Sequence, residues 1–195
     1  MRVASPPLAE LRWYLRPFFW LQRRRYGTYL TPATIWARVP ALYLALAGFY
    51  AALERRGSPL APGLRSLVQT RVSQLNHCVF CVDLNAAHAA QRSGSLAKAL
   101  AVDAWRDADC FSAPERLALE YAEAMTLTQG RVSDALSARL AGQFGEAALI
   151  ELTALIGFQN LSSKFNAALD IASQGLCPLP KRPDPPTGPT QERSG

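Results

Sequence analysis

The sequence predicts a single all-α domain followed by a polar tail. The chain of 195 residues is 49% hydrophobic and 18% charged, which is the composition of one globular domain. Apolar residues recur at helical spacings of three and four along nearly the whole chain, and no run alternates polar and apolar residues as a strand would. Six of the 14 prolines follow Cys177. We therefore expect the domain to span residues 1–176 and residues 177–195 to form a flexible, proline-rich tail.

Residues 1–56 are expected to form basic, aromatic-rich helices. Between residues 8 and 20 the apolar side chains follow a helical pattern, which Pro17 should bend or restart because proline has no backbone N–H. Further helices are expected to begin at Thr31, which precedes a proline, and at Pro40, since proline suits the first helical turn.

Residues 62–173 are expected to form the helical core, which brings the whole domain to roughly eight helices. A capping box at Ser112 opens one helix, and Gly142 and Gly145 separate two others. Gly175 should end the last helix. The helices expected in this region span 62–75, 78–91, 112–128, 133–140 and 146–172.

Two segments of the core resemble each other weakly. QLNHCVFCVDLNAA (74–87) and FQNLSSKFNAA (158–168) both present an asparagine near a helix end. The asparagines are spaced differently in the two segments, so the similarity indicates at most an internal helical duplication.

Positive charge is concentrated in the first third of the chain. The formal net charge is +6, and residues 1–65 contain ten arginines against two glutamates. Such a surface can bind nucleic acid or anionic lipid, but these arginines alternate with large apolar residues, which favours a solvated helix face or an intersubunit contact. We therefore expect no DNA or RNA partner. The region also carries more large aromatic side chains than a small domain usually exposes, which predicts a homo-oligomer. These residues are Trp13, Phe18, Phe19, Trp20, Tyr26 and Trp36.

The cysteine content and the hydrophobic runs suggest a cytoplasmic protein. Four cysteines are too few for a disulfide scaffold, and the first residues do not resemble a signal peptide, so a reducing compartment is expected. The apolar run at residues 39–53 has about 15 residues, fewer than the roughly 20 needed to cross a bilayer. We expect a buried helix there and no membrane span.

The pair Cys78 and Cys81 is the motif most indicative of chemistry. Two cysteines three residues apart on a helix lie one turn apart on nearly the same side, so they can form a reversible disulfide. A thiolate is favoured in the first turn of a helix, and a second thiol nearby traps the sulfenic acid that forms when a thiolate reduces a peroxide. Buried cysteines can also act simply as small apolar groups.

A zinc site is the other chemical reading of the cysteine pair. Structural zinc requires four ligands, and no second C-x-x-C follows. The remaining candidate ligands are His77, His88, Cys110 and Cys177. We expect no metal, and we expect Cys110 and Cys177 to be structural or exposed.

The order of motifs resembles that of a known family. The run LRSLVQTRVSQLNHCVFCVDLNAAHAA (64–90), ERLALEYAEA (115–124) and ELTALI (151–156) are similar to the carboxymuconolactone decarboxylase family, specifically its alkylhydroperoxidase D-like branch. The resemblance covers about residues 40–173. It implies an all-helical fold that assembles into dimers, trimers or hexamers, and a thiol-dependent hydroperoxidase activity.

Two relay residues typical of that branch are replaced. The resemblance implies a glutamate about twelve residues before the first cysteine and a histidine four residues after the second, and these positions hold Ser66 and Asn85. His88 lies seven residues beyond Cys81, about 10 Å further along the helix, so a water chain or a neighbouring subunit would have to connect them. His88 can equally be a satisfied core histidine.

Without that relay, thiol activation is expected to depend on the helix terminus, on the positive charge of Arg71 and on hydrogen bonds. Candidate donors and acceptors are Gln74, Asn76, Asn85 and Ser66. Asp83 projects away from the cysteine face and is expected to be a helix-N-terminal charge or a surface partner.

The favoured function is a thiol-dependent (alkyl)hydroperoxide reductase-like antioxidant protein. The resemblance assigns the sulfenic acid to Cys81 and the resolving role to Cys78, whereas the helix dipole alone favours Cys78 as the nucleophile. No cofactor is expected beyond the Cys78–Cys81 disulfide, which a partner protein or a small thiol would reduce. The alternatives are a non-catalytic redox-sensing or binding oligomer and, with less support, a lactone decarboxylase.

Overall fold

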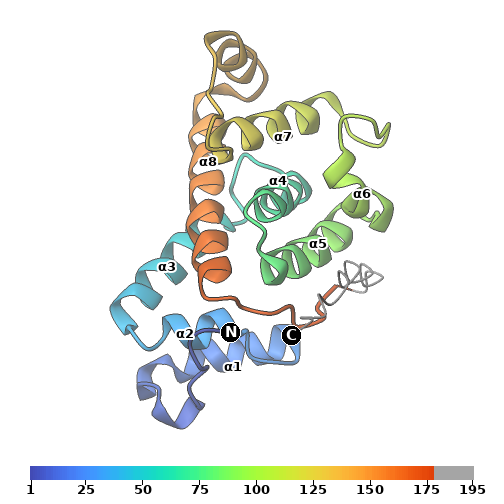
Figure 1. Cartoon of the computed structure of the whole chain (residues 1–195). Helices are drawn as coiled ribbons and strands as arrows, with labels where there is room; N and C mark the ends of the chain where they lie inside the picture. The colour runs from blue at the N-terminus through green and yellow to red at the C-terminus, as the bar shows by residue number, and fades with distance from the viewer. Residues whose placement is uncertain (178–195) are drawn as a thin grey trace, which may run out of the picture.

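Residues 1–177 are the part of the chain that the computed structural model describes, and they form helices and loops without a strand (Figure 1). This confirms the all-α class. The α-helices are α1 (Arg16–Tyr26), α2 (Thr31–Trp36), α3 (Pro40–Leu53), α4 (Pro62–Leu75), α5 (Val79–Ser93), α6 (Leu96–Leu100), α7 (Ala113–Thr126) and α8 (Asp134–Ala168). Short 3₁₀ helices span Leu8–Glu10, Trp13–Leu15 and Ala101–Ala104. The proline-rich tail expected at 177–195 lies outside the described residues from 178 onward.

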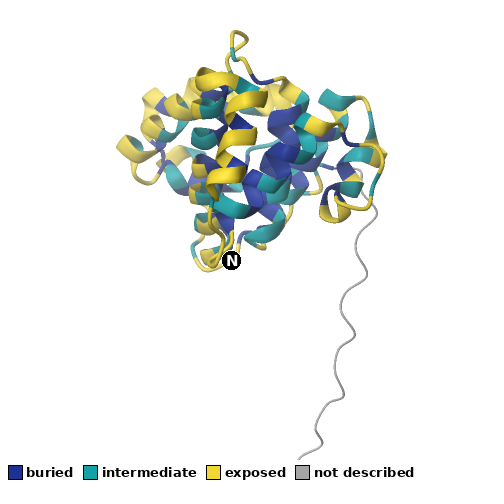
Figure 2. Ribbon diagram, turned by 90° about the horizontal axis from the view of Figure 1, so that it is seen from above, coloured by how far each residue is buried: buried dark blue, intermediate teal, exposed yellow. Residues whose placement is uncertain are grey.

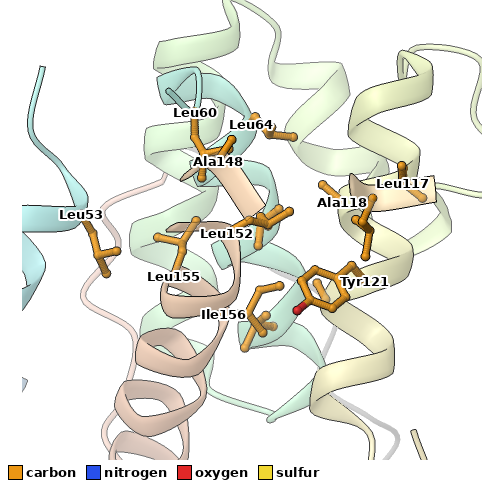
Figure 3. Packing of buried hydrophobic residues seen from close by; sticks show 14 of the residues in the cluster. Leu53, Leu60, Leu64, Leu117, Ala118, Tyr121, Ala148, Leu152, Leu155 and Ile156 are labelled. Atoms are coloured by element: carbon orange, nitrogen blue, oxygen red, sulfur yellow. The ribbon is translucent and has the colours of Figure 1, made fainter. Parts of the chain in front are cut away.

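Helix α4 occupies the middle of the molecule, with α5, α6, α7 and α8 arranged around it (Figure 1). Its bounds match the prediction because Pro62 starts it and the polar Asn76 turn ends it. The main apolar cluster joins α4, α7 and α8 (Figure 3). Leu152, Leu155 and Ile156 of α8 are fully buried in that cluster. The central helix therefore anchors the segment that leads directly into the cysteines.

The first three α-helices pack on one side of this core. Pro17 and Pro32 both lie in the first turn of their helices, as expected, and Gly27 ends α1 with a φ of 73°. Pro17 restarts the helix, so the chain before it forms only 3₁₀ turns.

Several aromatic side chains of this region remain at the surface. Burial is concentrated in the middle helices, whereas much of the periphery is exposed (Figure 2). Trp13 is 75% exposed and Trp20 is 62% exposed, while Phe19 is buried. These exposed rings are the feature on which the expectation of a homo-oligomer depends, and that expectation stays a prediction.

Helix α8 ends earlier than the sequence suggested. It stops at Ala168 rather than at residue 172, because Asp170 adopts a φ of 54° and the Ile171 N–H returns to the Asn166 carbonyl at 3.0 Å. The break expected at two glycines occurs only at Gly145, where φ is 68°. Ile171, 3% exposed, then carries the chain back toward the cysteines.

The length and composition of α8 would also allow it to cross a membrane. Core helices meet the same criterion, and Leu152, Leu155 and Ile156 of α8 are fully buried in the cluster with α4 and α7, whereas Ile150 and Leu161 are exposed. We therefore describe it as a core helix.

The ERLALEYAEA motif has a structural role through Glu123 on α7. This carboxylate accepts hydrogen bonds from Arg71 on α4 at 2.8 Å, from Trp105 at 2.9 Å and from Arg106 at 2.5 Å. Burial opposes ionisation, but the hydrogen bonds from Arg106, Trp105 and Arg71 outweigh it and hold the pKa of Glu123 below its usual value. Glu123 therefore ties α7 to the central helix.

We expect Glu123→Gln to lower the free energy of unfolding at pH 7 by about 2 kcal/mol, since charge-assisted hydrogen bonds are lost. A carboxyl whose folded-state pKa is depressed stabilises the fold above its unfolded-state pKa of about 4.3, and this contribution disappears as the pH falls through the folded-state value. Urea denaturation of both proteins from pH 7 to pH 3 should show the difference shrinking at low pH. A constant difference over that range would contradict the assignment.

Candidate active site

Cys78 and Cys81 lie together at the start of α5. Cys78 is the N-cap residue, and its Sγ accepts a hydrogen bond from the Cys81 N–H at 3.2 Å. The Cα atoms are 5.2 Å apart and a disulfide joins the two side chains. The preceding turn reverses the chain through His77, which is exposed and has a φ of 53°. The sequence spacing thus places both sulfur atoms in one helical turn, as expected.

A cavity of about 290 Å³ opens beside the pair, and Cys81 lines it whereas Cys78 does not. Helices α1, α2 and α3 supply most of one wall, which is apolar and aromatic. The aromatic lining residues are Phe18, Tyr26, Trp36, Tyr43, Tyr50, Phe80 and Phe158. The polar lining near Cys81 consists of amides from α4, α5 and α8, namely Gln69, Asn85, Gln159 and Asn166.

Asn166 on α8 contacts the Cys81 sulfur directly. Its Nδ2 donates to the Cys81 Sγ at 3.2 Å, and its Oδ1 is buried with no hydrogen-bond partner among the described residues. A donor directed at the sulfur favours the thiolate over the thiol once the disulfide is reduced. Asn166 is therefore a neutral donor to this sulfur, contributed by a helix that the sequence analysis did not connect with it.

A second amide network supports the floor of the cavity. Asn85 and Gln159 both donate to the Ser73 Oγ, at 3.1 and 2.9 Å, and Ser73 donates to the Gln69 carbonyl at 2.6 Å. These residues are buried. Asn85 is thus the one predicted supporting residue of α5 that lines the cavity, and its partner is Ser73.

The other predicted supporting residues are engaged elsewhere. Ser66 accepts from Arg92 at 3.1 Å, and Asn76 donates to Asn160 and Ser163, both at 2.9 Å. Gln74 accepts from Arg71 at 3.3 Å. None of the three lines the cavity.

Arg71 is engaged by a residue of another helix. Its guanidinium is directed at Glu123 of α7 at 2.6 Å, a carboxylate that it shares with Arg106, and Arg71 does not line the cavity. Arg71 is held toward α7 by a partner distant in sequence, and the expectation that its charge acts on the cysteines stays a prediction.

His88 is a buried histidine one hydrogen bond away from the cavity. Its Nε2 lies 3.3 Å from the hydroxyl of Tyr26, which lines the cavity. Burial, followed by the positive charges of Arg92 and Arg25, lowers the pKa of His88 to about 4 against the opposing charge of Glu54. The imidazole is consequently neutral at pH 7 and accepts or donates a hydrogen bond without carrying charge.

An ion pair lies near the position where the family relay has its glutamate. Arg92, which donates to Ser66, also pairs with Glu54 at 2.7 Å. A carboxylate is thus present in this region, but it comes from the end of α3 and is bound to arginine.

Asp83 is not the surface partner that the sequence suggested. It is only 8% exposed and accepts from the Ser173 hydroxyl and from the backbone N–H groups of residues 174, 176 and 177, at 2.6 to 3.0 Å. We call residues 169–177 the C-terminal strap. The strap passes between α5 and the N-terminal helices (Figure 1), where Ile171 and Leu176 pack in the cluster that contains Cys78.

Sequence reasoning missed Asn166, the partner that α8 brings to Cys81, and the cavity-lining residues Gln159 of α8 and Tyr26 of α1. Asn166 and Gln159 lie within the second of the two similar segments, so that weak similarity was the signal that pointed to them. Tyr26 was noted only as an aromatic residue. No group of three or more His, Cys, Asp or Glu side chains within residues 1–177 is arranged to hold a metal ion.

Comparison with known proteins gives the family. The family model for "Carboxymuconolactone decarboxylase family" matches residues 40–124. The Escherichia coli (strain K12) protein YnjA is 51% identical over 180 residues, covering 92% of this chain and 99% of YnjA. The chain belongs to the carboxymuconolactone decarboxylase family.

Within the carboxymuconolactone decarboxylase family, the fold is alkylhydroperoxidase D-like. The crystal structure of an alkylhydroperoxidase AhpD core, a peroxidase-related protein from Ralstonia eutropha JMP134, has a TM-score of 0.77 at 21% identity and covers 86% of this chain and 88% of its own. A cysteine-to-alanine variant of the debrominase Bmp8, in complex with 2,3,4-tribromopyrrole, has a TM-score of 0.73 at 20% identity, with coverages of 86% and 92%. These structures confirm the fold.

Proposed function

We propose that the protein is a thiol-dependent reductase of organic hydroperoxides, with Cys81 as the attacking thiol and Cys78 as the resolving thiol. The observation that carries this proposal is that Cys81 lines the cavity and Cys78 does not, although both side chains are buried. A substrate in the cavity therefore meets Cys81 first. This supports the assignment implied by the family over the one that the helix dipole alone would favour.

The reaction balances with these two residues and one external reductant. The Cys81 thiolate attacks an oxygen of the hydroperoxide, the O–O bond breaks, and the alkoxide leaves and takes up a proton to give the alcohol. The Cys78 thiol then attacks the Cys81 sulfenic acid, which forms the disulfide and releases water. A dithiol protein or a small thiol returns two electrons to the disulfide by thiol exchange.

Activation rests on neutral donors rather than on a charged relay. In the first turn of α5 the Cys81 N–H donates to the Cys78 Sγ, and Asn166 donates to the Cys81 Sγ. Both interactions favour the thiolate. The aromatic wall supports an organic substrate over hydrogen peroxide, because apolar substituents leave water when they enter the cavity.

The test follows thiols in the reduced Cys110→Ser protein, since Cys110 is exposed and would react nonspecifically. We expect cumene hydroperoxide to consume two thiols per chain at least about a hundredfold faster than it consumes glutathione, because the site binds the substrate and favours the thiolate. Hydrogen peroxide should react more slowly. Thiol loss at the glutathione rate would overturn the proposal.

Reductive dehalogenation is a second candidate, favoured by the aromatic wall and by the bound aromatic ligand of Bmp8. The reduced protein would be incubated with 2,3,4-tribromopyrrole and bromide release followed with thiol loss. Bromide release without hydroperoxide reduction would favour this candidate. Slow thiol loss with both compounds would instead favour the redox-sensing or binding role. The decarboxylase alternative is tested separately, by following the loss of a carboxylated lactone through its ultraviolet absorbance.

A further inference from the structure

Arg25 is the one charged side chain that lines the cavity within the described residues. It comes from the last turn of α1 and is exposed. Its guanidinium carbon lies 5.4 Å from the centroid of the Tyr26 ring, and it forms no ion pair with any residue in 1–177. The cavity thus combines an apolar, aromatic wall with one uncompensated positive charge.

The surroundings of Arg25 do not cancel that charge. The nearest charged pair, Arg92 and Glu54, is internally balanced at 2.7 Å. Burial is the main cause of the lowered pKa of His88, and the charges of Arg92 and Arg25 add to it while Glu54 opposes it. No carboxylate lines the cavity in the described part of the chain, so an anion that enters meets no like charge at its wall.

The size of the cavity limits what can accompany the negative charge. A volume of about 290 Å³ is at the lower end of the range of small-molecule sites. It suits one aromatic ring or a short branched alkyl group rather than a long acyl chain. Arginine binds a carboxylate through two parallel hydrogen bonds, which fixes the orientation of such a ligand.

We propose that the cavity selects a small amphipathic carboxylate, with its apolar body against the aromatic wall and its carboxylate paired with Arg25. The reacting group at the other end of the ligand then faces Cys81. Binding of such an anion follows from the cavity alone, whereas its role as a substrate rests on the proposed hydroperoxide reduction. Arg25 is a positioning residue in this scheme.

Binding is tested on the oxidised protein, which cannot turn over. Titration calorimetry would compare 4-isopropylbenzoate with its neutral analogue 4-isopropylbenzamide. We expect the carboxylate to bind about tenfold more tightly, in line with one charge-assisted contact near the surface. Arg25→Gln should abolish that preference. Arg24→Gln is the matched control, because Arg24 lies on the same helix beside Trp20 and does not line the cavity.

Equal binding of the carboxylate and the amide by the unchanged protein would overturn the inference. So would an equal loss of the carboxylate preference in Arg25→Gln and in Arg24→Gln.

Turnover is compared separately with cumene hydroperoxide and its 4-carboxylate derivative. We expect the carboxylate to have a kcat/KM about tenfold higher, mainly through KM, and this advantage to disappear in Arg25→Gln. If neither compound is reduced while the binding preference persists, the proposed function fails and the anion site stands.

Discussion

Replacing Cys81 with serine is expected to abolish the fast reaction with organic hydroperoxides. The hydroxyl of serine is not ionised at neutral pH, and neither the first turn of α5 nor Asn166 can make it a comparable nucleophile. The rate of hydroperoxide consumption should fall at least about a thousandfold. Serine has nearly the volume of cysteine and can accept the Asn166 hydrogen bond, so the fold should be retained.

Cys78→Ser is the matched variant and should behave differently. Cys81 still attacks the peroxide, but no resolving thiol closes the cycle, so one thiol per chain is lost and the sulfenic acid can be labelled with dimedone. Both variants are measured in the Cys110→Ser background by stopped-flow thiol assay and mass spectrometry. If Cys78→Ser is inert and Cys81→Ser forms the sulfenic acid, the roles are reversed and the helix dipole decides the nucleophile.

Asp83→Ala should cause the largest loss of stability among changes outside the apolar core. The carboxylate accepts one hydroxyl and three backbone N–H groups of the C-terminal strap. Unsatisfied buried donors each cost about 1–3 kcal/mol, but a released strap regains water, so we expect a net loss of about 3 kcal/mol in the free energy of unfolding. Urea denaturation measures it, with the exposed Asp109→Ala as a control that should change it by less than about 0.5 kcal/mol.

The same substitution also tests what the strap covers. Ile171 and Leu176 pack in the cluster with Cys78, so releasing the strap should expose the resolving thiol. Alkylation of the reduced Cys110→Ser protein by iodoacetamide should label Cys78 faster when Asp83 is replaced. If Asp83→Ala changes neither the free energy of unfolding nor the rate at which iodoacetamide labels Cys78, the strap is held by its apolar residues alone.

The helices were predictable wherever the chain marks its own ends. Pro62 and the capping box at Ser112 gave the starts of α4 and α7 correctly. The end of α8 was not predictable, because it depends on Asp170 adopting a left-handed conformation that the sequence would more readily assign to glycine. Helix α6 was missed because five residues give too short a pattern.

The site was predictable only where its geometry is local in the sequence. The spacing of Cys78 and Cys81 is local, so sequence alone gives their geometry. Asn166 reaches Cys81 across 85 positions of the chain, and Arg71 pairs with Glu123 from another helix. Such pairings depend on tertiary packing, and a single sequence contains them only as faint similarities between segments.

Part of the wall around Cys81 comes from stretches of the chain that lie outside the family pattern. The family pattern covers residues 40–124, which include both cysteines of α5, whereas α1, α2 and the part of α8 that carries Asn166 lie outside it. On the proposed function, the cysteine pair can be inherited with the segment that matches the family while the choice of substrate diverges with the segments outside it. Exchanging residues 1–36 between members that share the cysteine helix would then be a route to new selectivity without redesign of the chemistry.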